Sequence, residues 1–379
     1  MLKGCMTLER TGGNCEVKMA RLVLDARESG TSTGRYVDKL VENLAKLKPN
    51  FEIIVLTKSQ RVEALKQIAP NFKILAADYK EFSFFGEQLG LAWRLYRLRP
   101  ALVHFSMTQQ PLLYFGRSVT TVHDLTTARF RNPAKNIFVF KFKQCVYRFV
   151  IVWVAHKSQA ILVPTEWVKN DLAGFARIKK DKIAVTYEAA DKIEAAAQPI
   201  PGLKPGKFIA WVGRPLPHKN LARLTAAFGL VKKRHPDLKL ALAGKKDVLY
   251  QKLEASAPNG VVIPGFLTDG QWRWFYENAA VYAYPSLSEG FGLQGLEAML
   301  YSLPVVSSSA TCLPEVYGEA ALYFDPKNID DMAAKINLLL DDKKLRTELI
   351  KKGSKQVRKY SWRQTAEQTL AVYQKSLTK

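Results

Sequence analysis

Two glutamates in the second half of the chain are spaced so that they could hold one hydroxyl-rich ligand. Glu289 falls in an expected loop, and Glu297 lies eight positions later, on the helix expected to follow that loop. Eight helical residues rise about 12 Å, so the two carboxylates cannot bind one atom but can hold the two ends of one ligand. Carboxylates accept hydrogen bonds from paired hydroxyls, so each suits a sugar ring or a ribose.

Glycines surround the first of these glutamates. Gly290 and Gly292 flank Phe291, and the helix is expected to start near Leu293. Glycine lets the backbone approach a ligand closely, and the first N–H groups of a helix are available to an anion. This loop would therefore attract a phosphate group.

A second glycine-started loop carries two cations. It spans residues 213–220 and reads GRPLPHKN, so that Gly213 is followed by Arg214 and then by Lys219. Two cations in one loop suit a pyrophosphate, which carries more charge than a single cation neutralises. The alternative is a loop that is merely charged because it lies at the surface.

In the first half, His123 and Asp124 end an expected strand and start a His-Asp-Leu segment. A histidine at the end of such a strand can contact a substrate, or it can be a structural residue whose ring nitrogens are satisfied. The aspartate can likewise contact a substrate or cap the turn that follows.

The elements that would position these residues follow an α/β rhythm. From Arg21 onward, short apolar runs alternate with longer helical patterns, as in a parallel sheet with crossover helices. The pattern predicts two doubly wound α/β domains, with ligands at the carboxyl ends of the strands. The expected strands are 21–26, 51–57, 72–76, 102–105, 119–123, 160–164 and 183–187, then 208–212, 238–243, 261–264, 280–284, 304–308 and 321–324.

The length of 379 residues favours two domains over one. Between residues 188 and 207 the pattern dissolves into sequence rich in alanine, proline and glycine, which indicates a linker. We expect the last helix, about 363–379, to pack back on the N-terminal domain. The predicted ranges are a disordered leader at 1–18, an N-terminal acceptor-side domain at 19–195, a linker at 196–206 and a C-terminal nucleotide-sugar-binding domain at 207–362.

The two glutamates, within the context Glu-Gly-Phe-Gly-Leu, resemble the signature of the retaining glycosyltransferases of family 4. The resemblance covers nearly the whole chain, because 307–309 (SSS), 313–316 (LPEV) and 321–326 (ALYFDP) follow the family's order and spacing. It implies the GT-B fold, in which two Rossmann-like domains face each other across a cleft. Within the family, the His-Asp-Leu and Leu-Pro-Glu-Val segments look most like those of bacterial mannosyl- or related transferases that build surface polysaccharide.

The resemblance implies a role for each site residue. Glu289 would contact donor-sugar hydroxyls and Glu297 the nucleotide ribose, while Arg214 and Lys219 would bind the phosphates and His123 would face the transferred sugar. The loop at 28–36 has fewer glycines than is usual in the family, which leaves Gly34 as its one firm position. The other implied contacts are Gly213, Gly290, Phe291, Gly292, Leu293, Phe266 and Leu267 on the donor side, and Gly34, Asp124 and Thr165 on the acceptor side.

The implied reaction moves a sugar from a nucleotide diphosphate sugar to a glycan or lipid-linked acceptor. GDP-mannose is favoured over UDP-sugars as the donor. Because no carboxylate is placed as a nucleophile, we expect front-face substitution, with the cations and the helix N-terminus stabilising the departing diphosphate. The sequence contains no Asp-x-Asp motif, so we expect neither a metal nor any cofactor beyond the donor.

The charge balance bears on partners and location. Against 34 Asp and Glu there are 57 Lys and Arg, a net charge of +23. Such an excess attracts anionic membranes, nucleic acids or phosphorylated substrates, although it can also serve solubility alone. The sequence has no nucleic-acid-binding signature, and its four cysteines form no metal-type pair. We expect no nucleic acid partner and a cytoplasmic protein with free thiols, peripheral on the inner face of the cell membrane.

Two other functions are compatible with the α/β pattern. A nicotinamide-dependent dehydrogenase is disfavoured, because neither opening strand is followed by Gly-x-Gly-x-x-Gly. A catalytically degenerate GT-B scaffold that docks on membranes or on a partner enzyme is the second alternative. The intact glutamate pair and the Arg-Lys loop favour the enzyme.

Overall fold

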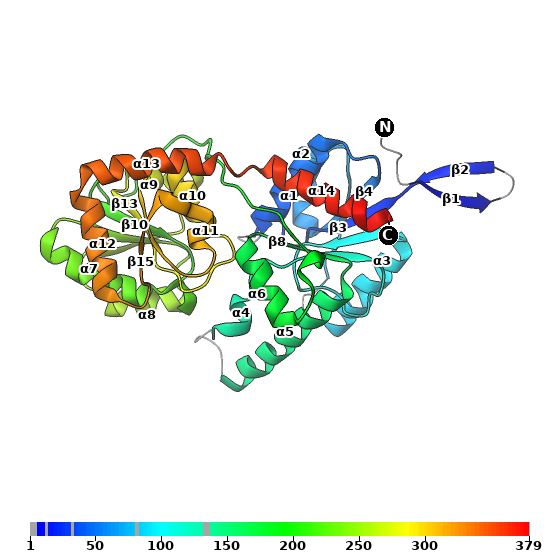
Figure 1. The fold of residues 1–379 in the computed structure, drawn as a ribbon, viewed down its shortest axis with the longest axis horizontal. Coiled ribbons are helices and arrows are strands. Elements are labelled where there is room, and N and C mark those ends of the chain that lie inside the picture. Colours follow the sequence, from blue (N-terminus) through cyan, green and yellow to red (C-terminus); the bar gives the residue numbers. More distant parts are fainter. Residues whose placement is uncertain (1–5, 12–13, 32–33, 80–82, 132–136, 379) are drawn as a thin grey trace. The chain divides into compact units, whose positions relative to one another are not determined.

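The computed structural model describes residues 6–11, 14–31, 34–79, 83–131 and 137–378. They divide into two compact units (Figure 1). Unit 1 comprises residues 1–125, 145–188 and 362–379, and unit 2 comprises residues 126–144 and 189–361. In the range predicted to be a disordered leader, strand β1 (Met6–Thr11) pairs antiparallel with β2 (Asn14–Met19).

Unit 1 is built on a parallel sheet of seven strands in the order β5-β4-β3-β6-β7-β8-β9. All seven strands predicted for the first half of the chain are present, because each is a short apolar run that helices bury. The strands are β3 (Arg21–Asp25), β4 (Glu52–Thr57), β5 (Lys73–Ala76), β6 (Leu102–Phe105), β7 (Ser118–Thr121), β8 (Ala160–Val163) and β9 (Ile183–Val185).

The helices of this half connect successive strands, and one returns from the end of the chain. The last helix, α14 (Trp362–Thr378), belongs to unit 1, where it packs on α1. Its Tyr373 hydroxyl lies 2.5 Å from Nδ1 of the fully buried His104 on β6. The other helices of the first half of the chain are α1 (Gly34–Leu47), α2 (Val62–Ile68), the π-helix η2 (Phe84–Leu91), α3 (Ala92–Leu98), α4 (Thr126–Arg129), α5 (Ile137–Lys157) and α6 (Glu166–Ala176). Of these, α4 and the part of α5 up to Gln144 belong to unit 2.

Unit 2 repeats the architecture with a parallel sheet of six strands, in the order β12-β11-β10-β13-β14-β15. Apolar residues of α7 and α12 pack on its inner strands in one buried cluster. Its strands are β10 (Phe208–Val212), β11 (Lys239–Ala243), β12 (Val261–Gly265), β13 (Val281–Tyr284), β14 (Val305–Ser308) and β15 (Ala321–Phe324). Its helices are α7 (Leu221–Arg234), α8 (Val248–Ser256), α9 (Asp269–Asn278), α10 (Leu293–Leu300), α11 (Leu313–Tyr317), α12 (Ile329–Asp341) and α13 (Lys343–Val357).

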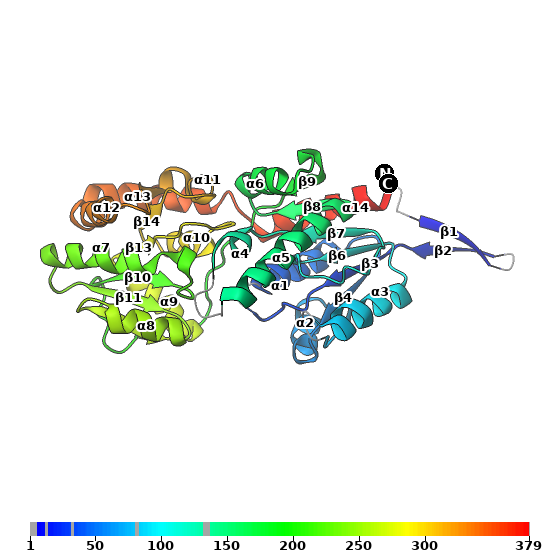
Figure 2. The same cartoon turned by 90° about the horizontal axis from the view of Figure 1, so that it is seen from below.

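Both sheets have the strand order of doubly wound folds, with the order reversing beside β3 in unit 1 and beside β10 in unit 2. Helices lie on both faces of each sheet (Figure 2). In such folds, loops at the carboxyl ends of the strands next to the reversal point form binding sites. These loops contain most of the residues singled out in the sequence. None of the described helices is long and apolar enough to cross a membrane.

Candidate active site

The centre of the candidate site in unit 2 is an ion pair between two loops. Lys219 ends the short 3-10 helix after β10, and Glu289 lies in the loop after β13. The Lys219 Nζ lies 2.7 Å from Oε1 of Glu289, and the two side chains are 18% and 12% exposed. The structure thus brings together the cation predicted for the phosphate and the carboxylate predicted for the sugar.

Asn220 fixes the position of this pair. Its backbone is left-handed, with a φ of 58°, and its side chain is buried. Its Nδ2 donates to the carbonyl oxygens of Pro285, at 3.0 Å, and of Pro326, at 2.7 Å. One side chain therefore joins the loops that follow β10, β13 and β15. The sequence analysis did not select Asn220, although an asparagine directly before a helix, where left-handed backbone is tolerated, was a usable signal.

The glycines of the second loop allow α10 to begin in a crowded place. Gly292 has a φ of +89°, and a Cβ there would lie 2.6 Å from both Leu313 Cδ2 and the Tyr317 hydroxyl oxygen. No side chain caps α10, which starts at Leu293. An uncapped helix N-terminus presents N–H groups and a partial positive charge, as predicted for this loop.

Glu297 lies on α10 but is almost completely buried. Its Oε2 accepts a hydrogen bond of 2.8 Å from the hydroxyl of Tyr276 on α9. Burial and the neighbouring Glu297 carboxylate raise the pKa of Tyr276 well above its ordinary value, so the phenol stays protonated and donates. The carboxylate predicted to bind the ribose is therefore oriented by a tyrosine that the sequence analysis missed.

Arg214 lies in the same loop as Lys219 but pairs with a different element. Its Nε lies 2.9 Å from Oδ2 of Asp247, and the arginine side chain is 59% exposed. Asp247 also caps α8 by accepting from the N–H groups of Leu249 and Tyr250. The hydroxyl of Tyr250 donates to the carbonyl of Gly213, at 2.8 Å. This half of the loop is thus held to α8.

The four apolar residues predicted on the donor side have different exposures, and Leu293, the first residue of α10, is partly buried. Phe266, after β12, is 76% exposed, whereas the adjacent Leu267 is buried. Phe291 is also buried and packs edge-on against Tyr360, with ring centroids 5.6 Å apart. Leu267 and Phe291 therefore contribute their backbone to the loops, and their side chains belong to the core of unit 2.

In unit 1, His123 is held through both ring nitrogens. Nδ1 lies 3.3 Å from Oε1 of Glu188, and Nε2 lies 3.2 Å from the carbonyl oxygen of Ser106. Both partners are acceptors, so this geometry fits an imidazolium that donates from both nitrogens. Burial alone would lower the pKa of His123, but Glu188, aided by Asp124 and the Ser106 carbonyl, raises it above its ordinary value.

The other residues predicted on the acceptor side have different local roles in the structure. Gly34 begins α1 so close to the preceding loop that a Cβ would lie 1.8 Å from the carbonyl oxygen of Glu28. Thr165 is fully buried, and its Oγ1 caps α6 by accepting from the N–H of Val168. Its side chain is therefore committed to the helix terminus. Asp124 is partly buried beside His123 and contributes to the raised pKa of that ring.

A buried charge network at the carboxyl edge of the same sheet was not predicted. Arg27 donates to both carboxylate oxygens of Asp25, with Nη2 to Oδ2 at 2.8 Å, and to Oε1 of Glu87 at 3.0 Å. The three side chains are at most 7% exposed. The available signal was an Asp-x-Arg that begins at the last residue of β3, but the arginine's second partner lies 60 residues away on η2.

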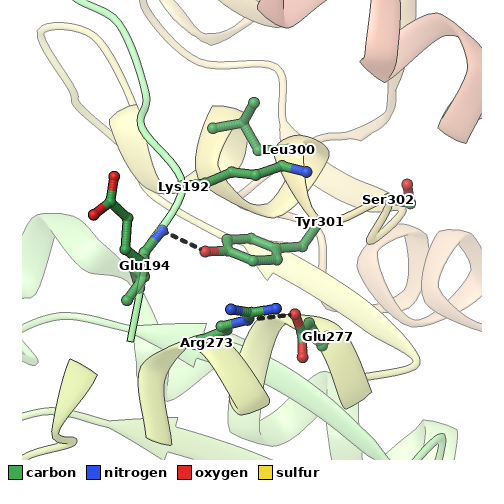
Figure 3. Close-up of a pocket in the computed structure, with 8 residues that line it drawn as sticks. Lys192, Glu194, Arg273, Glu277, Leu300, Tyr301 and Ser302 are labelled. Atoms are coloured by element: carbon green, nitrogen blue, oxygen red, sulfur yellow. Dashed lines mark hydrogen bonds and ion pairs between the residues drawn. The ribbon is translucent and has the colours of Figure 1, made fainter. Parts of the chain in front are cut away.

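A separate pocket of unit 2 lies at the other end of α10 (Figure 3). In it, Arg273 pairs with Glu277 at 2.7 Å, and the Tyr301 hydroxyl accepts from the N–H of Ile193. It contains none of the predicted donor-binding residues, so we do not regard it as the donor site. Its lining residues are Lys192, Ile193, Glu194, Arg273, Glu277, Leu300, Tyr301 and Ser302.

Comparison with known proteins assigns each half of the chain to a glycosyltransferase family. Residues 194–356 match the model for glycosyl transferases group 1, and residues 33–192 match the model for Glycosyltransferase Family 4. The O-antigen chain mannosyltransferase B of Escherichia coli is 27% identical over 373 residues, covering 90% of this chain and 96% of that protein.

Solved structures agree on the fold. Sucrose-phosphate synthase from Thermosynechococcus elongatus superposes with a TM-score of 0.72 at 16% identity, covering 94% of this chain and 98% of that one. Anabaena HepE in complex with UDP and glucose superposes with a TM-score of 0.70 at 14% identity, covering 94% and 100%. From the matched models and the shared fold, we conclude that this chain is an enzyme of the group 1 glycosyltransferases and has the GT-B fold.

Proposed function

We propose that this enzyme transfers mannose, with retention of configuration, from GDP-mannose to a glycan or lipid-linked acceptor. The observation that carries the proposal is the ion pair of Lys219 with Glu289 beside the uncapped N-terminus of α10. A nucleotide diphosphate sugar has the complementary chemistry, because it offers two phosphates to a cation and sugar hydroxyls to a carboxylate. The resemblance to an O-antigen mannosyltransferase favours mannose and a polysaccharide product.

Donor binding would change the partners of the two cations in the loop after β10. Lys219 and Arg214 are each paired with a carboxylate in the protein. On this proposal, Lys219 turns to the diphosphate while Glu289 keeps the sugar hydroxyls, and the first N–H groups of α10 take the remaining phosphate oxygens. Glu297, held by Tyr276, would accept from the ribose hydroxyls.

The transfer step would be a front-face substitution. The bond between the anomeric carbon and the diphosphate oxygen breaks as the acceptor oxygen bonds to that carbon on the same face. The acceptor's proton moves to the departing phosphate oxygen. Lys219 and the helix N-terminus would stabilise the negative charge that develops on the leaving group. We propose that the protein's own cations suffice for this, without a metal ion.

A thermal-shift screen tests the donor. GDP, UDP, ADP and their sugars are compared at equal concentration, because a ligand that binds the folded state more tightly raises the unfolding midpoint further. We expect GDP and GDP-mannose to give the largest shifts, and an equal or larger shift with UDP would exclude the GDP assignment. NMR of the product's anomeric proton then tests retention, and a chelator tests independence from metal. A β-linked product, or activity that is lost on chelation and restored by magnesium, would contradict those two parts.

A further inference from the structure

Exposed apolar side chains are concentrated on one part of unit 1. Phe85 on η2 is 80% exposed, Trp93 on α3 is 60% exposed and Phe149 on α5 is 59% exposed. Large apolar side chains are usually buried, and contiguous exposed ones mark an interaction site. We call this set the aromatic surface: Phe84, Phe85, Leu89, Trp93, Tyr96, Leu113, Phe115, Val146, Phe149 and Trp153.

Direct contacts connect the elements that carry the aromatic surface. The helix η2 continues directly into α3. The Tyr96 hydroxyl on α3 accepts from the N–H of Phe115 at 2.9 Å. The Nζ of Lys157, at the end of α5, lies 5.9 Å from the ring centroid of Phe115. The surface therefore runs from η2 and α3, over the loop at 111–116, to α5; α3 and α5 are labelled in Figure 1.

On α5 exposed aromatic side chains lie one turn apart, whereas other apolar residues of the helix are buried in the protein. Phe149 and Trp153 are one turn apart and stack with ring centroids 6.2 Å apart, whereas Ile151 and Val154 are buried. A helix that shows aromatic rings to the outside is unusual for a protein surface exposed only to water. The helix is not long and apolar enough to span a bilayer, so its exposed face suits a membrane interface.

Basic residues predominate on the elements of the aromatic surface: Glu87 of η2 is buried against Arg27, and the exposed Asp78 interacts with Arg94. Between Gln88 and Thr165 the sequence has a single acidic residue, Asp124. Arg97 lies over the ring of Trp93, with Cζ 4.6 Å from its centroid, and Arg148 on α5 lies over the ring of Phe175, with Cζ 5.5 Å from its centroid. The basic residues of this stretch that belong to unit 1 are Arg94, Arg97, Arg99, Arg117, Arg148 and Lys157, and the Nζ of Lys157 is buried.

We propose that the aromatic surface docks this enzyme on an anionic lipid bilayer. Aromatic rings favour the membrane interface, where their apolar bodies are buried, and the arginines are attracted to lipid phosphates. A second copy of this surface is a poor partner, because like charges would face each other. The inference deepens the proposed function, since it supplies a way to reach a lipid-linked acceptor. Membrane binding can be measured without donor or acceptor, so this inference can fail while the proposed function holds.

Vesicle flotation measures the docking directly. The full chain is mixed with vesicles of equal phosphatidylglycerol and phosphatidylcholine, or with phosphatidylcholine alone. We expect flotation only with the anionic vesicles, decreasing as salt screens the charges. Absence of flotation at low salt, or equal flotation with neutral vesicles, would overturn the proposal.

Matched variants assign the binding to this surface. Phe85→Ser combined with Trp93→Ser should weaken vesicle partitioning at least about tenfold, because two aromatic side chains that would be buried in the membrane interface are lost. Arg97→Gln should weaken it about fivefold. Leu338→Ser on α12 and Lys343→Gln on α13 are exposed changes in unit 2 and should leave partitioning unchanged. An equal loss in these controls would contradict the assignment.

Tryptophan quenching reports which residues enter the interface. Trp93 and Trp153 are exposed, whereas Trp211 and Trp274 are buried in unit 2. Brominated lipid in the anionic vesicles should quench part of the emission, and Trp93→Phe with Trp153→Phe should abolish that part. Quenching that persists in this double variant would show that another surface binds the membrane.

Discussion

The charged residues at the carboxyl edges of the two sheets differ in how far they are exposed to solvent. In unit 2, Lys219 and Glu289 form a single ion pair on two loops, with both side chains partly exposed. In unit 1, Arg27 is enclosed between Asp25 and Glu87 and is nearly inaccessible. A partly exposed pair can exchange one partner for a ligand at low cost, whereas a buried network can lose a member only with a large desolvation penalty. Unit 2 thus has charges available for binding, and unit 1 uses this network for its own structure.

Replacing the available cation should have the largest effect. We expect Lys219→Ala to lower kcat by about 10²–10³-fold at saturating donor, as when a group that stabilises developing charge is removed. Arg214→Ala is the comparison, and its effect should be smaller because the side chain is mostly exposed and bound to Asp247. Steady-state kinetics of both variants measure the difference. Normal turnover of Lys219→Ala would remove Lys219 from the chemistry.

Breaking the enclosed network should affect folding. Glu87→Ala leaves the buried Nη1 of Arg27 without its carboxylate partner, while Asp25 still pairs with the guanidinium, and should lower the free energy of unfolding by about 2 kcal/mol. Glu63→Ala, which breaks an exposed pair with Lys66, should change it by less than about 1 kcal/mol. Urea titration measures both. Equal losses would mean that the network is no more important than a surface pair.

A glycine substitution tests how tightly the donor loop is built. Gly292→Ala places a Cβ against Leu313 and Tyr317 at a positive φ and should destabilise by about 2 kcal/mol. Gly229→Ala in α7 meets no atom within 4 Å and should stabilise by up to about 1 kcal/mol. Thermal unfolding compares the two. We expect the two substitutions to change the stability in opposite directions. An unchanged stability of Gly292→Ala would show that the loop relaxes freely.

The smallest expected effect concerns the histidine of unit 1. Because the folded pKa of His123 is raised, its contribution to stability is complete below the ordinary pKa of 6.5 and is lost as pH rises through the folded pKa. Glu188→Gln removes the negative charge that offsets the effect of burial on the ring, so the pKa of His123 should fall. NMR titration of the ring protons measures it. An unchanged pKa in Glu188→Gln would show that Glu188 does not hold the imidazolium.

The strands and several site loops followed from local sequence. Every predicted strand of both sheets is present, because short apolar runs separated by glycine, proline and polar residues specify buried parallel strands locally. The loops with Gly213 and Gly292 were also recognisable, since a positive φ in a tight turn calls for glycine. The roles assigned to these residues in catalysis and binding stay predictions.

The partners of the charged residues could not be read from the sequence. The sequence determined that Lys219, Glu289, Arg27 and His123 follow strands, and therefore that they lie at the carboxyl edges of two sheets. Only the tertiary structure decided that Lys219 meets Glu289, 70 residues away, and that Arg27 meets Glu87, 60 residues away. Local patterns fix where a side chain leaves the backbone. Its partner and its burial depend on packing between segments that are distant in the chain.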